Sequence, residues 1–452
     1  MGRRDDLVAR RHRQGYSQEA LAERLGVDPC TVARWEQGTT TPQPWLRPRI
    51  ARILSLSLDE VDRLLVNQRA GLVESGVWPV EHRHRIYCGC DGDVLDAPWS
   101  AAGTVHVLQE IAGGVMDRRG FLIASGGTLT GLATQWAAGL GNAAVTLAPG
   151  DRSSGVALGV IGRFESRLAD LRRLDDAMGG TQLRHLAVAE FRALTRLAAD
   201  ATESTCHRLF AATAEAARIC GWLHFDVGEH AEAQSHYIAA LRASSTANDP
   251  LTGANVLACM SLQATSTGHH REAVTLIDSA RDQLGRNATP RLSALLASRQ
   301  ARAHARAGDA TACGRALNAA ESHLEAATSA TTEPDWIYFF DEAELAAQTG
   351  ACWVELNQPD RARPFIDNAL HTIDASYVRD RALYRARSAE AYLQDRELHL
   401  ACEELSTAVD LARQTGSVRV ISTVRHTRQN MGTHNREPCV IELDDRLRAL
   451  AA

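Results

Sequence analysis

Residues 17–38 read SQEALAERLGVDPCTVARWEQG, and this stretch decides the fold of the N-terminal region. Apolar residues recur at helical spacing on both sides of Gly26, a residue that tolerates the positive φ of a tight turn. Ser17 is suited to cap a first helix. Asp28 is suited to cap a second helix, with Pro29 at its first position, where a missing N–H costs nothing. The stretch therefore predicts two short helices joined by a glycine turn.

Two helices in this arrangement are typical of a helix-turn-helix, whose second helix enters the major groove of DNA. Residues 46–66 continue with two more apolar helical faces. With SQEALAERLGV, TVARWEQG and LRPRIARILSLSLDEVDRLL in order, residues 5–66 resemble the phage-repressor-like, or Xre-type, helix-turn-helix family. The resemblance implies a five-helix DNA-binding domain over residues 1–67. A related module that docks on proteins and binds no DNA is the alternative.

Candidate DNA contacts lie at the start and along the outer face of the second predicted helix. We expect Thr31 and Arg34 to read base edges, and Gln18 and Gln37 to lie near the phosphate backbone. The predicted contact set is Gln18, Asp28, Pro29, Cys30, Thr31, Arg34 and Gln37. One helix in one groove buries too little surface for tight binding, so we expect a homodimer on a two-fold operator in double-stranded DNA. Trp35 falls in the apolar register and is expected in the core.

Composition and charge are typical of a DNA-binding head on a large acidic body. The chain has 452 residues and a formal net charge of −6. Residues 1–69 hold twelve arginines against nine acidic residues, a net charge of +3, which leaves −9 for the remainder. This asymmetry suits a regulator that touches DNA at one end. The ten cysteines are mostly single and no N-terminal signal sequence is recognisable, so we expect a cytoplasmic protein.

Residues 68–155 lose the helical regularity and are expected to form a linker and connector. Its closely spaced histidines and cysteines are His82, His84, Cys88 and Cys90. Their spacing lacks the two ligand pairs of a structural zinc site, so no metal is predicted. Residues 120–150 carry no charge and follow an arginine pair, a pattern also found in export signals and membrane spans. Their mid-chain position and glycine content favour a weakly helical connector packed on the C-terminal body, without membrane attachment.

From residue 156 to 452 the pattern is helical, and it repeats around five turn positions, which we call the turn anchors. The turn anchors are Gly228, Gly268, Gly308, Asn357 and Arg396. Each has a small residue seven positions before it, a large apolar residue nine positions after it and an alanine twelve positions after it. Small residues let helices cross closely, and the large one fills the gap to the next repeat. The pattern predicts an array of helix pairs.

These helix pairs resemble the tetratricopeptide repeat with lengthened helices, which implies an α-solenoid with a concave binding face. Stretches such as WLHFDVGEHAEAQSHYIAALRAS (222–244) and MDRRGFL (116–122) are similar to actinobacterial regulators that join an Xre-type head to a tetratricopeptide body. The layout is also similar to the peptide quorum-sensing regulators of Gram-positive bacteria. The expected fold class is therefore all-α, with a helix-turn-helix domain followed by a tetratricopeptide-type α-solenoid.

In tetratricopeptide arrays the first helix of each pair lines the concave face, which locates a candidate ligand groove. The predicted lining residues are Arg218, Trp222, Phe225, Asn255, Leu262, Ser298, Arg302 and Glu344. Aromatic surface, an amide and charges of both signs suit a peptide, small-molecule or protein ligand.

These patterns together predict a sequence-specific DNA-binding transcriptional regulator whose array senses a ligand, dimerises the chain, or does both. Phosphate-binding loops, HExxH, GxSxG and Cys/His nucleophile signatures do not occur in a fitting context, so neither enzyme activity nor a cofactor is predicted. A protein-interaction scaffold without ligand sensing is the alternative, as is a repressor whose array only dimerises it. A DNA footprint that responds to a ligand would distinguish the sensor from both.

Overall fold

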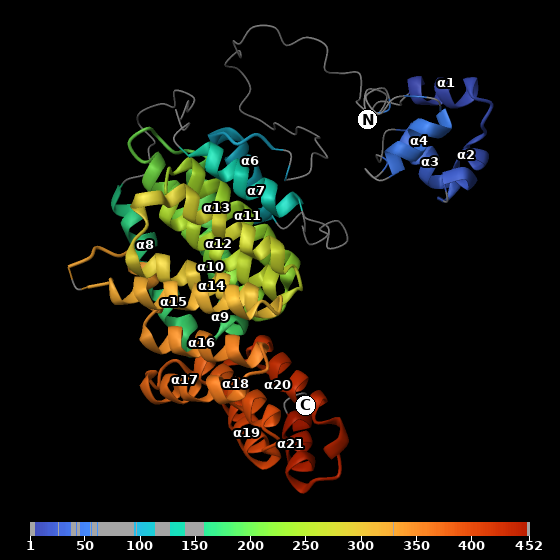
Figure 1. The fold of residues 1–452 in the computed structure, drawn as a ribbon. Helices are drawn as coiled ribbons and strands as arrows, with labels where there is room; N and C mark the ends of the chain where they lie inside the picture. The colour runs from blue at the N-terminus through green and yellow to red at the C-terminus, as the bar shows by residue number, and fades with distance from the viewer. Residues whose placement is uncertain are drawn as a thin grey trace. The chain divides into compact units, whose positions relative to one another are not determined.

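The structure is a computed structural model of the chain. It describes residues 5–25, 27–37, 42, 46–54, 56, 61, 95, 97–113, 127–140, 158–328 and 330–449. These residues form α-helices and short 3-10 helices, and they contain no strand (Figure 1). The predicted all-α fold class is confirmed for this part of the chain. Two compact units are present, Met1–Cys90 and Asp91–Ala452.

The first unit is a small helical domain with its own core. Its described helices are α1 (Asp5–Arg13), α2 (Gln18–Leu25), α3 (Pro29–Glu36) and α4 (Arg47–Leu54). The buried residues of this core include Leu7, Leu21, Leu25, Val32, Trp35, Ile50, Leu54 and Val61. Apart from Val61, the fifth helix expected in this domain lies outside the described residues.

The helix starts of the first unit follow the predicted caps. The Ala20 N–H donates to the Ser17 hydroxyl at 3.1 Å, which satisfies a free donor at the start of α2. The Cys30 N–H donates to the Asp28 carboxylate at 2.8 Å, and Pro29 is the first residue of α3. These caps fix where α2 and α3 begin.

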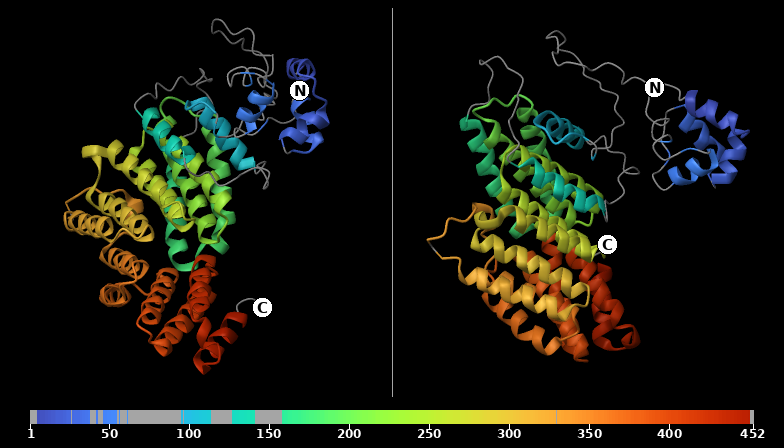
Figure 2. Two further views of the ribbon diagram at one scale, coloured as in Figure 1. Left: turned by 45° about the vertical axis from the view of Figure 1, so that its right-hand side comes forward. Right: turned by 45° about the horizontal axis from the view of Figure 1, so that its top comes forward.

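The second unit is an array of antiparallel helix pairs, which stack in sequence order (Figures 1 and 2). Its helices are α6 (Ala101–Gly113), α7 (Gly127–Gly139), α8 (Leu158–Met178), α9 (Gly180–Ala198), α10 (Cys206–Asp226), α11 (His230–Thr246), α12 (Pro250–Ser266), α13 (His270–Leu284), α14 (Pro290–Arg306), α15 (Ala310–Glu325), α16 (Glu342–Glu355), α17 (Pro359–Thr372), α18 (Val378–Gln394), α19 (Leu398–Thr415), α20 (Val418–Asn430) and α21 (Pro438–Ala449). Five of the pairs, from α10 and α11 to α18 and α19, turn at the predicted anchors.

All five turn anchors adopt positive φ. The values are 79° at Gly228, 88° at Gly268, 77° at Gly308, 55° at Asn357 and 66° at Arg396. Glycine adopts this conformation freely, asparagine tolerates it, and arginine adopts it only at some cost in free energy. The last two repeats therefore keep the turn geometry of the first three without their glycine, and the predicted register of the repeat is confirmed.

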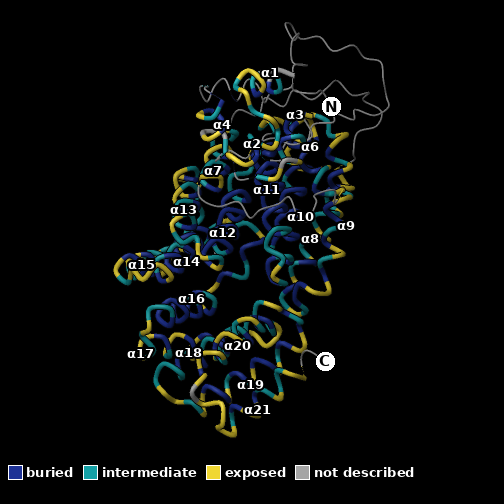
Figure 3. Tube along the Cα trace, turned by 90° about the vertical axis from the view of Figure 1, so that its right-hand side faces the viewer, coloured by how far each residue is buried: buried dark blue, intermediate teal, exposed yellow. Residues whose placement is uncertain are grey.

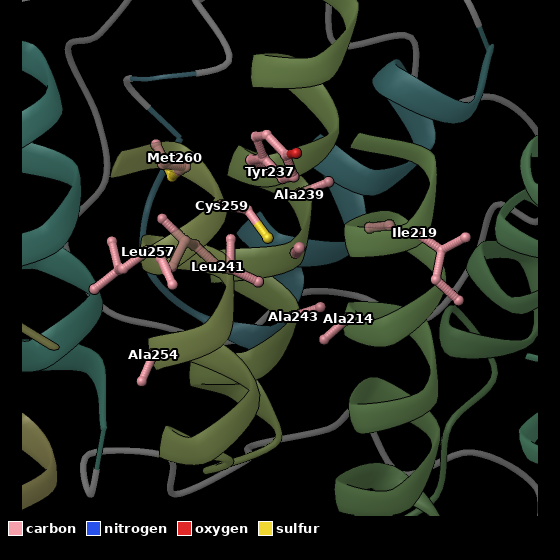
Figure 4. Packing of buried hydrophobic residues seen from close by; sticks show 14 of the residues in the cluster. Ala214, Ile219, Tyr237, Ala239, Leu241, Ala243, Ala254, Leu257, Cys259 and Met260 are labelled. Carbon is pink, nitrogen blue, oxygen red and sulfur yellow. The ribbon is translucent and has the colours of Figure 1, made fainter. Parts of the chain in front are cut away.

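The small and large positions of the repeat pack on each other within one helix pair. A Cβ atom on Gly221 would lie 2.5 Å from the ring of Tyr237, and one on Gly350 would lie 2.5 Å from Ile366. Glycine at these two positions thus permits the close crossing of the two helices. The large residue thus fills space inside its own pair. Figure 4 shows Tyr237 among the packed residues of α10, α11 and α12.

One repeat is longer than the others because a loop is inserted before α16. The segment between α15 and α16 includes a short 3-10 helix, Asp335–Ile337, and it buries Trp336 and Phe340. This insertion accounts for the wider spacing between Gly308 and Asn357. Two further 3-10 helices are Gly285–Asn287 and Gly432–His434.

Helices α6 and α7, which belong to the expected connector, pack on the array. Helix α6 contacts α9 and α11, and α7 contacts α11 and α13. Trp136 of α7 is fully buried, and its indole Nε1 donates to the Ser244 hydroxyl at 3.1 Å. Among the described residues, no helix is long and apolar enough to span a membrane. His82, His84, Cys88 and Cys90 lie outside the described residues.

The two ends of the array meet. Helix α8 contacts α18 and α19, and α20 contacts α10. Arg379 donates to Asp175 at 2.7 Å, and the Ser417 hydroxyl donates to Asp226 at 3.0 Å. We call these the closing contacts. They join the beginning of the array to its end. Most residues of the first helices of the pairs, such as α10 and α12, are buried (Figure 3).

Candidate functional site

The first candidate site is the outer face of α3 in the first unit. Cys30, Arg34 and Gln37 are exposed, Thr31 is half-buried, and Asp28 is exposed at the start of the helix. These side chains follow one another along α3, which suits a helix that enters a DNA groove. Trp35, in contrast, is buried in the core, as its register predicts.

A buried polar network fixes the three helices of this site. The Arg11 Nε atom donates to Glu36 Oε1 at 2.5 Å, and Arg11 Nη1 donates to the Tyr16 carbonyl at 2.7 Å. Gln18 Nε2 donates to Glu36 Oε2 at 2.6 Å. The predicted phosphate contact Gln18 thus also holds α2 against α3. Arg11 is a structural residue, which its position in an arginine-rich stretch did not reveal.

The second candidate site is a cavity of about 900 Å³ inside the array, which we call the array cavity. Its walls come from the first helix of each pair and from α8 and α20 at the two ends. The predicted groove residues that line it are Arg218, Trp222, Phe225, Asn255, Leu262, Arg302 and Glu344. The projection of first helices therefore leads to one cavity that these helices share.

Ser298 is the predicted lining residue that does not line the cavity. Its side chain is fully buried in the array, and the next residue, Arg299, lines the cavity in its place. Ser298 and Arg299 precede Arg302 by four and three residues, so both satisfy helical spacing. The spacing of the repeat could not show which of the two lines the cavity. The small side chain of Ser298 packs between the helices, and the long side chain of Arg299 reaches the cavity.

Acidic side chains in the array cavity are held in contrasting environments. Burial raises the pKa of Glu344, whose two oxygens accept from Gln348 Nε2 at 2.9 Å and from the Tyr384 hydroxyl at 2.5 Å. Burial also raises the pKa of Asp176 to about 6, although the hydroxyl of Tyr338 donates to it at 2.5 Å. Both groups are therefore weaker acids than exposed carboxyls.

Glu355 is the opposite case, because three arginines surround it. Arg306 lies at 2.7 Å, Arg302 at 3.3 Å and Arg387 at 3.4 Å from its carboxylate oxygens. Burial disfavours the charge of Glu355, but these arginines hold its pKa below the usual value. Arg387 also pairs with Glu390 at 2.6 Å, so three arginines face two carboxylates at this part of the wall.

Trp222 lines the cavity and also contacts residues from both ends of the array. Its indole Nε1 donates to Asp175 Oδ2 at 3.0 Å, and the guanidinium groups of Arg379 and Arg419 lie 5.6 and 5.1 Å from its ring centre. Sequence reasoning missed Asp175, Arg379 and Arg419. They come from helices at opposite ends of the array, where no repeat spacing connects them.

Comparison with known families identifies the domain that contains the first candidate site. The family described as a helix-turn-helix domain matches residues 5–64. No curated protein and no solved structure matches the chain. The match covers α1 to α4, including the caps and the exposed face of α3. The N-terminal unit thus carries a helix-turn-helix domain, which indicates a DNA-binding regulator.

Proposed function

We propose that the chain is a sequence-specific transcriptional regulator of the Xre type, with a head over residues 1–67 that binds double-stranded DNA. The observation that carries this proposal is the helix-turn-helix match over 5–64 together with the exposed polar face of α3. In this proposal residues 68–155 join the head to a tetratricopeptide-type array over 156–452, and the regulator is a cytoplasmic homodimer without catalytic activity.

The array in this proposal senses a ligand in the array cavity. A volume of about 900 Å³ lies within the range of small-molecule sites. A cavity of this size, lined by side chains of α8 to α20, favours a small molecule or a short peptide over a folded protein partner. This size is the observation that sets the sensor above the alternative of a scaffold that only docks proteins.

Arg34 is the residue with which we test DNA reading. An arginine that donates two bonds to one guanine contributes about 1–3 kcal/mol of discrimination. We expect Arg34→Ala to lose binding by about this amount at a selected operator and to relax base preference at one position per half-site. Arg315→Ala, an exposed arginine of the array, is the matched control. An Arg34→Ala protein with the same footprint and base preference contradicts the assignment.

Asn255 is the residue with which we test ligand sensing. A ligand changes DNA binding only if it prefers one arrangement of the two heads, so it must alter the array. We expect Asn255→Ala to abolish the effect of cell extract on a footprint while extract-free binding is retained. Trp222→Ala should act in the same way, but it also removes the bond to Asp175. If both variants respond normally, the array is a dimerisation scaffold.

A further inference from the structure

The array cavity contains buried N–H groups that have no hydrogen-bond partner among the residues that the structure describes. They include Nδ2 of Asn255, Nη1 of Arg299, and Nε and Nη1 of Arg302. The three residues are 2%, 6% and 7% exposed and lie on α12 and α14, which contact each other. Leaving a buried donor unsatisfied is costly, and leaving a buried charge uncompensated costs more. These groups can therefore donate to an acceptor bound in the cavity, and a negatively charged acceptor suits the two guanidinium groups best.

Arg299 differs from the other buried arginines of the wall. Arg218 donates two bonds to Glu215, at 2.9 and 2.8 Å, so its charge is compensated. Arg302 keeps an ion pair with Glu355. Arg299 forms no salt bridge within the described part of the chain, and burial lowers its pKa.

The carboxylate with the strongest influence on Arg299 already has hydrogen-bond partners of its own. Glu344 is the acidic group with the strongest electrostatic influence on Arg299. Both of its oxygens already accept hydrogen bonds from Gln348 and Tyr384, and burial favours its neutral form. Arg299 thus has no direct ion-pair partner among the described residues that line the cavity.

We propose that Arg299, assisted by Asn255 and Arg302, binds the carboxylate of a small organic acid or of a short peptide. A planar guanidinium with parallel N–H groups matches a carboxylate, and a single guanidinium without an ion-pair partner matches a monoanion better than a phosphate dianion. The apolar body of the ligand lies against Trp222 and Phe225, which line the same cavity. This inference rests on the proposed sensing role of the array and names the class of its ligand.

The test uses the full chain and four probes at equal ionic strength. Phenylacetate represents a free acid, N-acetyl-alanyl-phenylalanine a peptide terminus, phenylacetamide the neutral analogue, and inorganic phosphate the dianion. We expect at least one of the two acids, at millimolar concentration, to raise the Tm and to bind in titration calorimetry. Phenylacetamide and phosphate should do neither. The preferred acid then identifies the source of the carboxylate.

Two substitutions separate a binding role of Arg299 from a structural one. Arg299→Met should lose acid binding at least tenfold, yet its Tm without probe should equal or exceed that of the unaltered protein, because an uncompensated buried charge is removed. Arg218→Met should lower the Tm, because Glu215 loses a buried partner. Arg315→Met, an exposed control, should leave both the Tm and acid binding unchanged.

Several results would overturn the inference. They are equal binding of phenylacetate and phenylacetamide, binding of phosphate alone, binding of neither acid, unchanged acid binding by Arg299→Met, and a Tm loss in Arg299→Met as large as in Arg218→Met. A footprint that still responds to cell extract when neither acid binds would retain the proposed regulator and reject only its ligand class. Absence of any DNA binding would reject the regulator itself, whatever the probes show.

Discussion

Asp176 shows how the burial of one carboxyl group makes stability depend on pH. Its pKa is about 6 in the folded protein, against an ordinary value of 3.8. Between pH 3.8 and about 6, Asp176 is mostly ionised in the unfolded chain and still protonated in the folded protein. The free energy of unfolding therefore falls as pH rises through this range, by about 3 kcal/mol in total. We expect Asp176→Asn, which still accepts from Tyr338, to lack this fall.

The measurement is urea unfolding of both proteins between pH 4 and 8. Relative to the unaltered protein, Asp176→Asn should gain stability steadily up to about pH 6 and hold that gain at pH 7. A constant difference between the two proteins over the whole range would contradict the role of burial at this carboxyl.

Trp35 is a core residue beside a DNA-reading residue, and the two roles are separable. Because Trp35 is buried in the head core, Trp35→Ala should cost about 3–5 kcal/mol and unfold the head. Amide hydrogen exchange should show lost protection in α1 to α4 and retained protection in α10 to α19. A variant with a folded head and a selective loss of DNA binding would contradict the core role.

At the scale of elements, Arg242 holds the segment before α6 on the array. Its guanidinium donates to the carbonyl groups of Ala97 at 2.8 Å and Pro98 at 3.1 Å and lies 4.7 Å from the ring centre of Trp99. Methionine keeps the packing volume but cannot donate. We expect Arg242→Met to speed hydrogen exchange and proteolysis across residues 97–113, while the helical circular dichroism changes little.

Arg315→Met is the control for this prediction, because Arg315 is an exposed arginine elsewhere on the array. If protection of residues 97–113 is the same in Arg242→Met and in the control, α6 is held by its apolar contacts alone. Such a result would contradict our prediction that the hydrogen bonds from Arg242 to Ala97 and Pro98 hold this segment on the array.

Elements with a local signal were predictable from the sequence, and contacts between distant elements were not. Asp28 and Pro29 marked the start of α3 because capping involves residues next to each other. The turns at Asn357 and Arg396 contain no glycine at the anchor, yet they were predictable because the small and large apolar residues around them keep the spacing of the repeat. The contact between Asp175 and Arg379 joins residues far apart in the chain, so the periodicity of the sequence could not predict it.

At the scale of the whole array, closure depends on a few buried polar contacts. Asp226 is fully buried and accepts from Ser417 at 3.0 Å and from Arg419 at 3.2 Å. Removing one partner of a buried ion pair costs about 3–5 kcal/mol. We expect Asp226→Ala to separate the two ends of the array, which small-angle scattering would record as a larger radius of gyration.

Asp410 provides the comparison, because its ion pair with Arg446 is exposed. Asp410→Ala should leave both stability and radius of gyration nearly unchanged, since exposed pairs contribute little. Equal behaviour of the two variants would mean that apolar packing, rather than the buried carboxylate, closes the array.

We propose above all that the helix-turn-helix head and the array cavity form one ligand-responsive regulator. Footprinting of genomic DNA selected by the full chain, with and without cell extract, examines both parts in one experiment. We expect a two-fold protected site that extract alters in the unaltered protein and does not alter in Asn255→Ala and Arg299→Met. A chain that protects no site in either condition, or a footprint that extract alters equally in all three proteins, would contradict it.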